Sequence, residues 1–243
     1  MMFYISTCPG DRRDQIAAKG MMLQANMKLI STFLLLATLL LPGCSMLANR
    51  SAPTYINPVY AADVPDPSVK KFGHDYYVFG TTGQARLPDG RIFTVLRSRD
   101  LVHWQELGGA LTPPATNADY EYWAPEVAAN AGRYYLYYAQ GDTQPEHFVI
   151  RVAVSDRPEG PFTDSGAVLA DCTSNRFTID PFPFRDDDGQ WYLFYACDFP
   201  FDSPGQHAGT GIMVQRLSGM TNAVGDCRVV VAAAHGHCAA EPL

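Results

Sequence analysis

The hydrophobic pattern of the chain repeats as short aromatic strands separated by glycine turns. Three segments share this layout: DPSVKKFGHDYYVFG from Asp66, APEVAANAGRYYLYYA from Ala124 and DPFPFRDDDGQWYLFYA from Asp180. Each combines an Xaa-Pro pair, a short strand, a Gly turn and an aromatic-rich second strand, which is typical of a β-hairpin. The starting residues are 58 and 56 positions apart. The pattern therefore predicts a repeated hairpin unit.

A weaker repeat follows each of the first two hairpins and lengthens the unit. The segments VLRSRDLVHW and VAVSDRPEGPF carry Ser98 and Ser155, 57 residues apart, where a third strand would lead into an outer one. A four-stranded unit of this length is typical of one blade of a β-propeller, and from Asp66 onward the chain has room for about three. The predicted fold class is all-β, with about three successive blades and almost no helix between residues 57 and 230.

Composition agrees with this fold class and narrows the choice of partner. The 243 residues include 13 Tyr and 13 Phe, which favour strands, and 20 Gly and 18 Pro, which supply turns. The formal net charge is −7 and no dense run of Lys or Arg occurs, which argues against a nucleic-acid partner. A neutral polymer such as a polysaccharide fits better.

The amino-terminal region is interpreted as a targeting segment. Lys28 precedes an apolar run that is too short to span a bilayer but typical of a signal-peptide core. Met27 opens a better signal peptide than Met1, so residues 1–26 are interpreted as a mis-called extension. Residues 27–44 are predicted to be the signal peptide and residues 45–56 a linker.

The apolar run ends in Leu-Pro-Gly-Cys, which resembles the lipobox of bacterial lipoproteins. Cys44 would then carry the lipid and become the first residue of the mature protein. The expected location is the bacterial cell envelope, in the periplasm or on the outer-membrane surface, with the membrane contacted through the lipid anchor only. An ordinary cleaved signal peptide is the alternative.

The remaining cysteines show no paired C-x-x-C spacing of a zinc site. In an oxidising compartment a bridge between Cys172 and Cys197 is possible. The sequence leaves this pairing open.

Asp66 and Asp180 occupy the same position of the repeat. Because the innermost strand of each propeller blade starts beside the axis, the two carboxylates are expected to face a common cavity. Glycoside hydrolysis with inversion needs two carboxyl groups roughly 6.5–9.5 Å apart. For either residue alone, the alternative is a turn or strand-entry Asp that the following Pro holds in extended geometry.

Several motifs together resemble glycoside hydrolase family 43, the five-bladed propeller family of β-xylosidases, α-L-arabinofuranosidases and arabinanases. The motifs are AADVPDPSV, YWAPE, SDRPEGPF and IDPFPFRDDDG, in this order between about Asn57 and Val230. The resemblance implies hydrolysis of O-glycosidic bonds in arabinan, arabinoxylan or xylan, or in their oligosaccharides, by an inverting mechanism. It assigns the general base to Asp66, and to Asp180 the tuning of the acid's pKa and its orientation.

The resemblance also implies a general acid, a Glu in an EGP-type motif on the next blade after Asp180, and no such motif occurs there in this sequence. Loss of a positioned acid typically costs about 10²–10⁴ in rate. The 243-residue form is therefore expected to be an incomplete propeller over residues 57–243 and not to be a working hydrolase. Residues 230–243 lack strand alternation and are interpreted as an aberrant tail.

Two further residues are candidates for the substrate site. Trp123 enters the second blade beside the axis and presents a flat apolar face to a sugar, with core packing as the alternative. Glu126 lies two residues beyond Ala124, so strand alternation allows it to face the same side. It is expected to support the site from behind the groups that touch the sugar.

No cofactor is expected to be required, although the resemblance implies a possible structural calcium ion in the full-length family fold. The run from Asp186 to Gly189 resembles a calcium loop only superficially and predicts a hairpin turn. Retaining propeller families that act on fructosides use an NDPNG-like motif, and PDPSV here disfavours them. A surface lipoprotein that binds polysaccharide without cutting it is the alternative from another functional class.

Overall fold

The computed structural model describes residues 54–114, 120–143, 146–172, 177–199 and 208–232. By its contacts the chain divides into residues 1–54 and residues 55–243, and the architecture below is that of the second unit. The predicted extension, signal peptide, lipidated Cys44 and most of the linker lie outside the described residues, as does the tail beyond residue 232.

The described residues form β-strands and no helix, which confirms the all-β prediction. None of them belongs to a helix long and apolar enough to cross a membrane. The strands are β1 (Ser68–Phe72), β2 (Asp75–Gly80), β3 (Ile92–Ser98), β4 (Gln105–Thr112), β5 (Glu121–Asn130), β6 (Arg133–Thr143), β7 (Glu146–Ser155), β8 (Phe162–Ala170), β9 (Thr178–Arg185), β10 (Trp191–Phe199), β11 (Gly209–Leu217) and β12 (Ala223–Val231).

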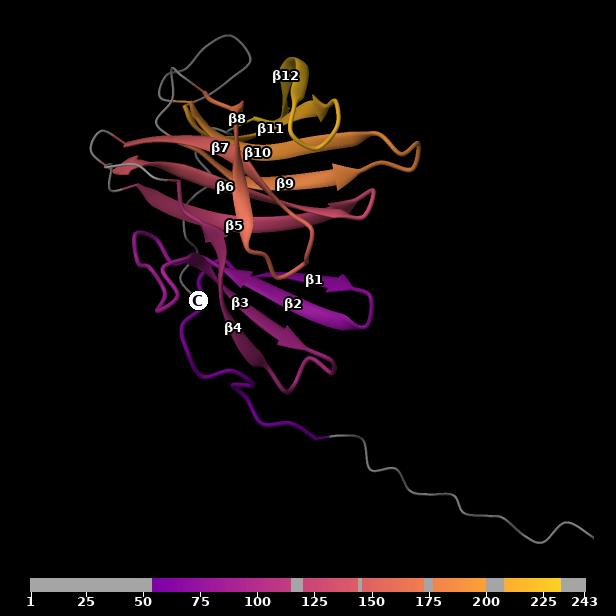
Figure 1. Ribbon diagram of the computed structural model, residues 1–243. Helices are drawn as coiled ribbons and strands as arrows, with labels where there is room; N and C mark the ends of the chain where they lie inside the picture. The colour runs from indigo at the N-terminus through magenta and orange to yellow at the C-terminus, as the bar shows by residue number, and fades with distance from the viewer. Residues whose placement is uncertain (1–53, 115–119, 144–145, 173–176, 200–207, 233–243) are drawn as a thin grey trace, which may run out of the picture. The chain divides into compact units, whose positions relative to one another are not determined.

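The strands form three antiparallel modules in chain order, each a four-stranded meander of the kind that makes a propeller blade. Module 1 is β1–β4, module 2 is β5–β8 and module 3 is β9–β12. Figure 1 shows them in turn from purple through red to yellow. Modules 1 and 2 share one continuous sheet, because β4 and β8 pair in parallel where Leu111 lies opposite Phe162.

Each module begins with the same backbone irregularity. Asp66, Ala124 and Asp180, which mark the sequence repeat, all adopt left-handed backbone with φ of 47°, 48° and 56°. Residues before proline normally avoid helical conformations and stay extended. The extended geometry that the turn or strand-entry alternative assumes for the two Asp-Pro pairs is therefore not found, and the cause is a bulge at the strand entry.

The bulge places two residues of the inner strand opposite one residue of its neighbour. In module 2 the pairing jumps from Trp123–Ala139 to Glu126–Tyr137, so that Ala124-Pro125 faces Tyr138 alone. Module 3 has the same shift beside Tyr195. Proline suits a bulge because this position donates no ladder hydrogen bond, and the residue before it turns out of the ladder.

In module 1 the same bulge depends on a glycine. The backbone N–H of Thr81 donates to the carbonyl oxygen of Pro65 at 2.9 Å, and Ser68 pairs with Phe79. A Cβ on Gly80 would lie 2.2 Å from the Val64 side chain. Gly80 therefore allows the segment before Asp66 to approach the end of β2.

Apolar side chains of neighbouring modules meet in two core clusters. The cluster between modules 1 and 2 includes Phe79, Phe93, Leu136 and Phe162. The cluster between modules 2 and 3 contains the following buried residues: Tyr137, Phe148, Ile150, Val152, Leu193, Tyr195, Met213 and Leu217. The modules are therefore joined mainly by side-chain packing between their faces.

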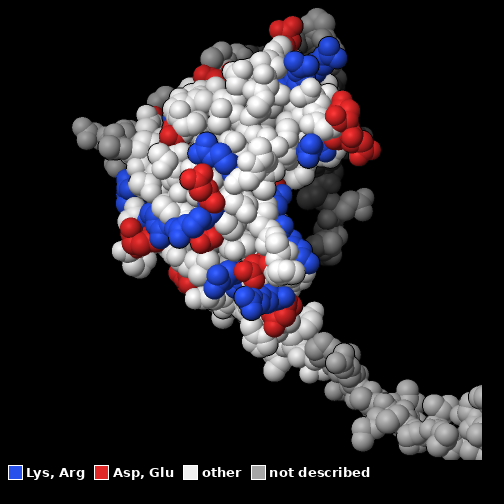
Figure 2. Space-filling model, turned by 45° about the vertical axis from the view of Figure 1, so that its right-hand side comes forward, with Lys and Arg blue, Asp and Glu red and all other residues white. Residues whose placement is uncertain are grey.

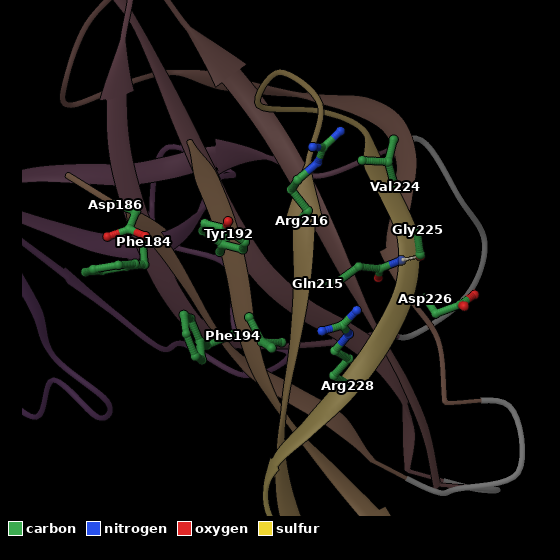
Figure 3. Close-up of a pocket in the computed structure, with 11 residues that line it drawn as sticks. Phe184, Asp186, Tyr192, Phe194, Gln215, Arg216, Val224, Gly225, Asp226 and Arg228 are labelled. Atoms are coloured by element: carbon green, nitrogen blue, oxygen red, sulfur yellow. Dashed lines mark hydrogen bonds between the residues drawn. The ribbon is translucent and has the colours of Figure 1, made fainter. Parts of the chain in front are cut away.

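The side chain at one position of the repeat, Phe79, Tyr137 or Phe194, differs in burial between the three modules. Phe79 is fully buried and lies edge-to-face with Phe162 at 6.5 Å. Tyr137 is also fully buried, and its hydroxyl donates to the carbonyl oxygen of Met220 at 2.7 Å. The equivalent Phe194 is only partly buried and lines a groove of about 580 Å³ on module 3 with Phe184 (Figure 3).

A disulfide joins Cys172, which follows β8, to Cys197 on β10, with Cα atoms 6.5 Å apart. It ties the connection between modules 2 and 3 to module 3 itself. The pairing that the sequence left open is thus present in the structure. Cys227 on β12 is a free, exposed thiol.

Phe79 and Phe194 occupy the same repeat position, but Phe79 lies on a covered module face and Phe194 on an open one. Truncating the two side chains should therefore affect stability differently. Phe79→Ala should lower the free energy of unfolding by about 3–5 kcal/mol, because it leaves a cavity in a packed core. Phe194→Ala should cost clearly less, because its ring already contacts solvent. Denaturant titration of the two variants measures the difference, and equal losses would contradict the structural equivalence.

Replacing both Cys172 and Cys197 by Ser should lower the free energy of unfolding by about 3 kcal/mol, because the bond closes a loop of 25 residues. Thermal or denaturant unfolding under non-reducing conditions checks this. Cys227→Ser is the matched control and should leave stability within about 0.5 kcal/mol of the parent. A double variant as stable as this control would refute the structural role of the bridge.

Candidate active site

The bulges of the three modules lie at the starts of the inner strands. Strand β5 contacts both β1 and β9, so the three innermost strands are neighbours (Figure 1). Asp66 lies two residues before β1, whereas Ala124 and Asp180 are the fourth residue of β5 and the third residue of β9. The repeat therefore brings two carboxylates and one methyl group to one region of the molecule.

The ionisation of Asp180 shows that the two carboxylates act on each other. Burial raises the pKa of Asp180 above its ordinary value of 3.8, and the negative charge of Asp66 raises this pKa further. The residue as a whole remains exposed to solvent, so its carboxylate is crowded by protein on one side and open on the other. Two acidic groups within electrostatic reach, one of them reluctant to ionise, are suited to acid–base chemistry.

Asp66 is held from the adjoining strand. Its Oδ2 accepts a hydrogen bond from the Thr81 hydroxyl at 2.8 Å. The same hydroxyl oxygen accepts a hydrogen bond from the backbone N–H of Ala124 at 2.9 Å. This chain of two bonds connects the carboxylate in module 1 to the bulge of module 2. Asp66 itself is exposed, so water can reach its carboxylate.

Glu126 lies behind the strand entries and is only 9% exposed. Its carboxylate accepts a hydrogen bond from the Ser68 hydroxyl and pairs with the ammonium of Lys70. Lys70 also lies over the Phe182 ring, 5.4 Å from its centroid. Glu126 thus links side chains of β1, β5 and β9, and contributes a buried charge that is paired, as such charges must be.

Trp123 precedes the left-handed Ala124 and is partly buried. Its indole N–H donates to Glu121 Oε2 at 2.6 Å, and its ring stacks on Phe148 with centroids 4.1 Å apart. Phe177 continues the stack on Phe148 at 5.5 Å. Packing against the core between modules 2 and 3 therefore accounts for part of the indole surface. These contacts hold the Trp123 ring, and Trp123 directly precedes the bulge residue Ala124.

The described residues include no group of three or more His, Cys, Asp or Glu side chains that could hold a metal ion. In the run from Asp186 to Gly189, the backbone N–H of Gly189 donates to the Asp186 carbonyl oxygen at 2.8 Å. This segment is a hairpin turn, as its sequence predicts.

The groove on module 3 is separate from these residues. It is lined by Phe184, Phe194, Val214 and Arg216 among others, and Gln215 bonds the Gly225 carbonyl across its rim (Figure 3). The equivalent face of module 2 is packed against module 3. The groove is thus explained as an uncovered module face.

Acidic and basic side chains are interspersed over the surface visible in Figure 2.

Sequence reasoning missed Thr81 and Lys70. A signal for Thr81 existed, because modules 2 and 3 have Ala139 and Ala196 at the equivalent repeat position. Because the repeat otherwise has alanine at this position, a polar residue there indicates a role other than packing. For Lys70 no comparable signal existed, since a lysine on an edge strand is usually a solvated residue.

Comparisons with known proteins show what this chain is similar to. The model of Glycosyl hydrolases family 43 matches residues 55–241. The Extracellular endo-alpha-(1->5)-L-arabinanase of Thermotoga petrophila is 30% identical over 172 residues, which covers 57% of this chain and 34% of that protein. Xylosidase/arabinosidase 43A of Humicola insolens is 43% identical over 74 residues, covering 30% of this chain and 21% of that protein.

Among solved structures, that of a thermostable family-43 glycoside hydrolase matches with a TM-score of 0.61 and 30% identity. The match covers 74% of this chain and 57% of that one. In the matched regions the chain spans about a fifth to a third of the length of the two curated relatives.

The coupling of the two carboxylates predicts that Asp66→Asn lowers the pKa of Asp180 toward 3.8, because one cause of the upward shift is removed. Carbon-13 NMR of the Asp180 carboxyl group over a pH titration measures this. Asp75→Asn, which removes a carboxylate that pairs with Arg99, is the control and should leave the titration unchanged. An unaltered pKa in Asp66→Asn would mean that the two groups are not coupled.

The same shift predicts how stability depends on pH. The pKa of Asp180 is higher in the folded chain, so ionising it opposes folding. This cost is absent below the unfolded pKa, grows as pH rises and is complete above the folded pKa. Asp180→Asn should therefore raise Tm slightly at pH 7 and not at pH 3. Calorimetry at the two pH values checks the sign.

Proposed function

Because the chain belongs to glycosyl hydrolases family 43, we propose that it hydrolyses O-glycosidic bonds of pentose-containing plant polysaccharides or oligosaccharides with inversion at the anomeric carbon. The observation that carries this proposal is the pair Asp66 and Asp180, which stand at equivalent bulges and are electrostatically coupled. The two relatives named above, an arabinanase and a xylosidase/arabinosidase, support arabinan, arabinoxylan or xylan as the substrate class.

In the proposed reaction Asp66 is the general base. Its exposed carboxylate takes one proton from a water molecule while the water oxygen bonds to the anomeric carbon. The bond between that carbon and the leaving oxygen breaks, and the leaving oxygen must receive a proton from an acid. Attack from the face opposite the leaving group gives inversion, and inverting enzymes hold the base and the acid far enough apart to admit the water.

Asp180 acts on the acid rather than on the sugar in this proposal. A carboxylate near a carboxylic acid raises the pKa of that acid and keeps it protonated for the leaving oxygen. The acid expected from the family resemblance is a Glu in an EGP-type motif on the blade after Asp180, and residues 181–243 contain no such motif. We therefore expect turnover of substrates with poor leaving groups to be reduced by about 10²–10⁴.

We further propose that the protein is exported and held to the cell envelope by a lipid on Cys44. The Cys172–Cys197 disulfide supports export, because structural disulfides persist mainly in oxidising compartments. The word "Extracellular" in the name of the Thermotoga petrophila relative agrees with export. The lipobox-like sequence before Cys44 is the basis for the anchor.

The test uses substrates that need no acid. In a 2,4-dinitrophenyl pentoside the leaving phenolate departs without protonation, so base catalysis alone suffices. We expect the full chain to hydrolyse 2,4-dinitrophenyl α-L-arabinofuranoside or β-D-xylopyranoside and to release the inverted sugar, seen by proton NMR. The p-nitrophenyl substrates should turn over more slowly.

Two variants assign the roles. Asp66→Asn should reduce kcat for the dinitrophenyl substrate by at least about 100-fold, because it removes the base and keeps the shape. Asp180→Asn should change it only a few-fold, because its partner acid is not needed. A retained anomer, or full activity in Asp66→Asn, would overturn the mechanism. Oligosaccharide binding without any turnover would favour the alternative of a non-catalytic carbohydrate-binding lipoprotein.

A further inference from the structure

Thr81 makes three hydrogen bonds at the point where modules 1 and 2 meet. Its backbone N–H donates to the Pro65 carbonyl oxygen at 2.9 Å, which closes the bulge on the amino-terminal side of Asp66. Its hydroxyl contacts Asp66 Oδ2 at 2.8 Å and the backbone N–H of Ala124 at 2.9 Å. One residue therefore fixes both the backbone before the carboxylate and the carboxylate itself.

The chemistry of the groups fixes the direction of these bonds. A backbone N–H can only donate, so the Ala124 amide must occupy a lone pair of the Thr81 oxygen. The hydroxyl proton is then directed to Asp66 Oδ2. The other carboxylate oxygen, Oδ1, has no hydrogen bond to another described residue. The two oxygens of Asp66, which is an exposed residue, are thus distinguished by their hydrogen bonds, since Thr81 holds Oδ2 and no described residue holds Oδ1.

The hydroxyl is not needed to build the bulge. Modules 2 and 3 form the same bulge with Ala139 and Ala196 at the position of Thr81. Both alanines are buried, so a methyl group satisfies the packing there. Module 1 alone has a hydroxyl at this position, and it is the one module whose bulge carboxylate accepts a bond from this position. The hydroxyl therefore serves the carboxylate rather than the fold.

We propose that Thr81 is a positioning residue for the general base. Its hydroxyl, directed by the Ala124 N–H, holds Asp66 Oδ2 so that Oδ1 is the oxygen that takes the proton from water. This inference rests on the proposed function for its catalytic meaning. The hydrogen-bond arrangement itself is independent of that function, because it makes a claim about Asp66 and Ala124 in the resting protein.

The test compares Thr81→Val, which keeps the shape and removes the hydroxyl, with Thr81→Ser, which keeps the hydroxyl. Kinetics with the 2,4-dinitrophenyl pentoside should show kcat about 10- to 100-fold lower in Thr81→Val with KM little changed, the size expected for one hydrogen bond to a charged group. Thr81→Ser should restore kcat to within a few-fold of the parent. Thr81→Ala, which copies modules 2 and 3, replaces the valine variant if that protein does not fold.

A spectroscopic measurement separates this inference from the proposed function. In Thr81→Val the Ala124 amide should shift upfield in the nitrogen–proton spectrum and exchange its hydrogen faster, and the Asp66 carboxyl carbon should also shift. Thr81→Ser should leave both signals near those of the parent. If the parent chain shows no Asp66-dependent turnover, the proposed function fails while these signals still decide the role of Thr81. Unchanged signals in Thr81→Val, or equal losses of kcat in the valine and serine variants, would overturn the inference.

Discussion

The site depends on a residue in left-handed backbone directly before a proline, repeated at the entry of every inner strand. This conformation is disfavoured twice, by the Cβ of the residue itself and by the ring that follows. Such strain costs on the order of 1–3 kcal/mol at each position and persists only where the surroundings hold it in place. Asp66, Ala124 and Asp180 accept it because the bulge turns their side chains out of the strand ladder.

The contacts that hold these entries come from neighbouring modules. The Ala124 amide reaches Thr81 in module 1, while Glu126 reaches Ser68 and Lys70 on β1. Neither set could form in an isolated module. The two apolar clusters between modules supply the packing that brings the strand entries together. Stability of the module interfaces and geometry of the site are therefore consequences of the same docking.

Departures from the repeat carry the chemistry. Ala124 stands where the other modules have Asp, and its backbone N–H donates to the Thr81 hydroxyl. Thr81 in turn stands where the other modules have Ala. Gly80 replaces the Tyr of the other two modules and makes room for Val64. A nearly symmetric scaffold thus acquires one distinct carboxylate environment through three substitutions that are close in space.

The sequence determined the local elements and their period, because alternation, glycine turns and spacing are short-range properties of the chain. It also identified Asp66 and Asp180 as equivalent, and the structure shows their charges coupled. It did not reveal the left-handed backbone at these residues, since the preference of a residue before proline is a local rule that the bulge overrides. Only the tertiary structure decided the partners of Glu126, the disulfide of Cys172 and the bonds of Thr81. Each of these joins residues that are distant along the chain, and the packing of modules against one another sets that proximity.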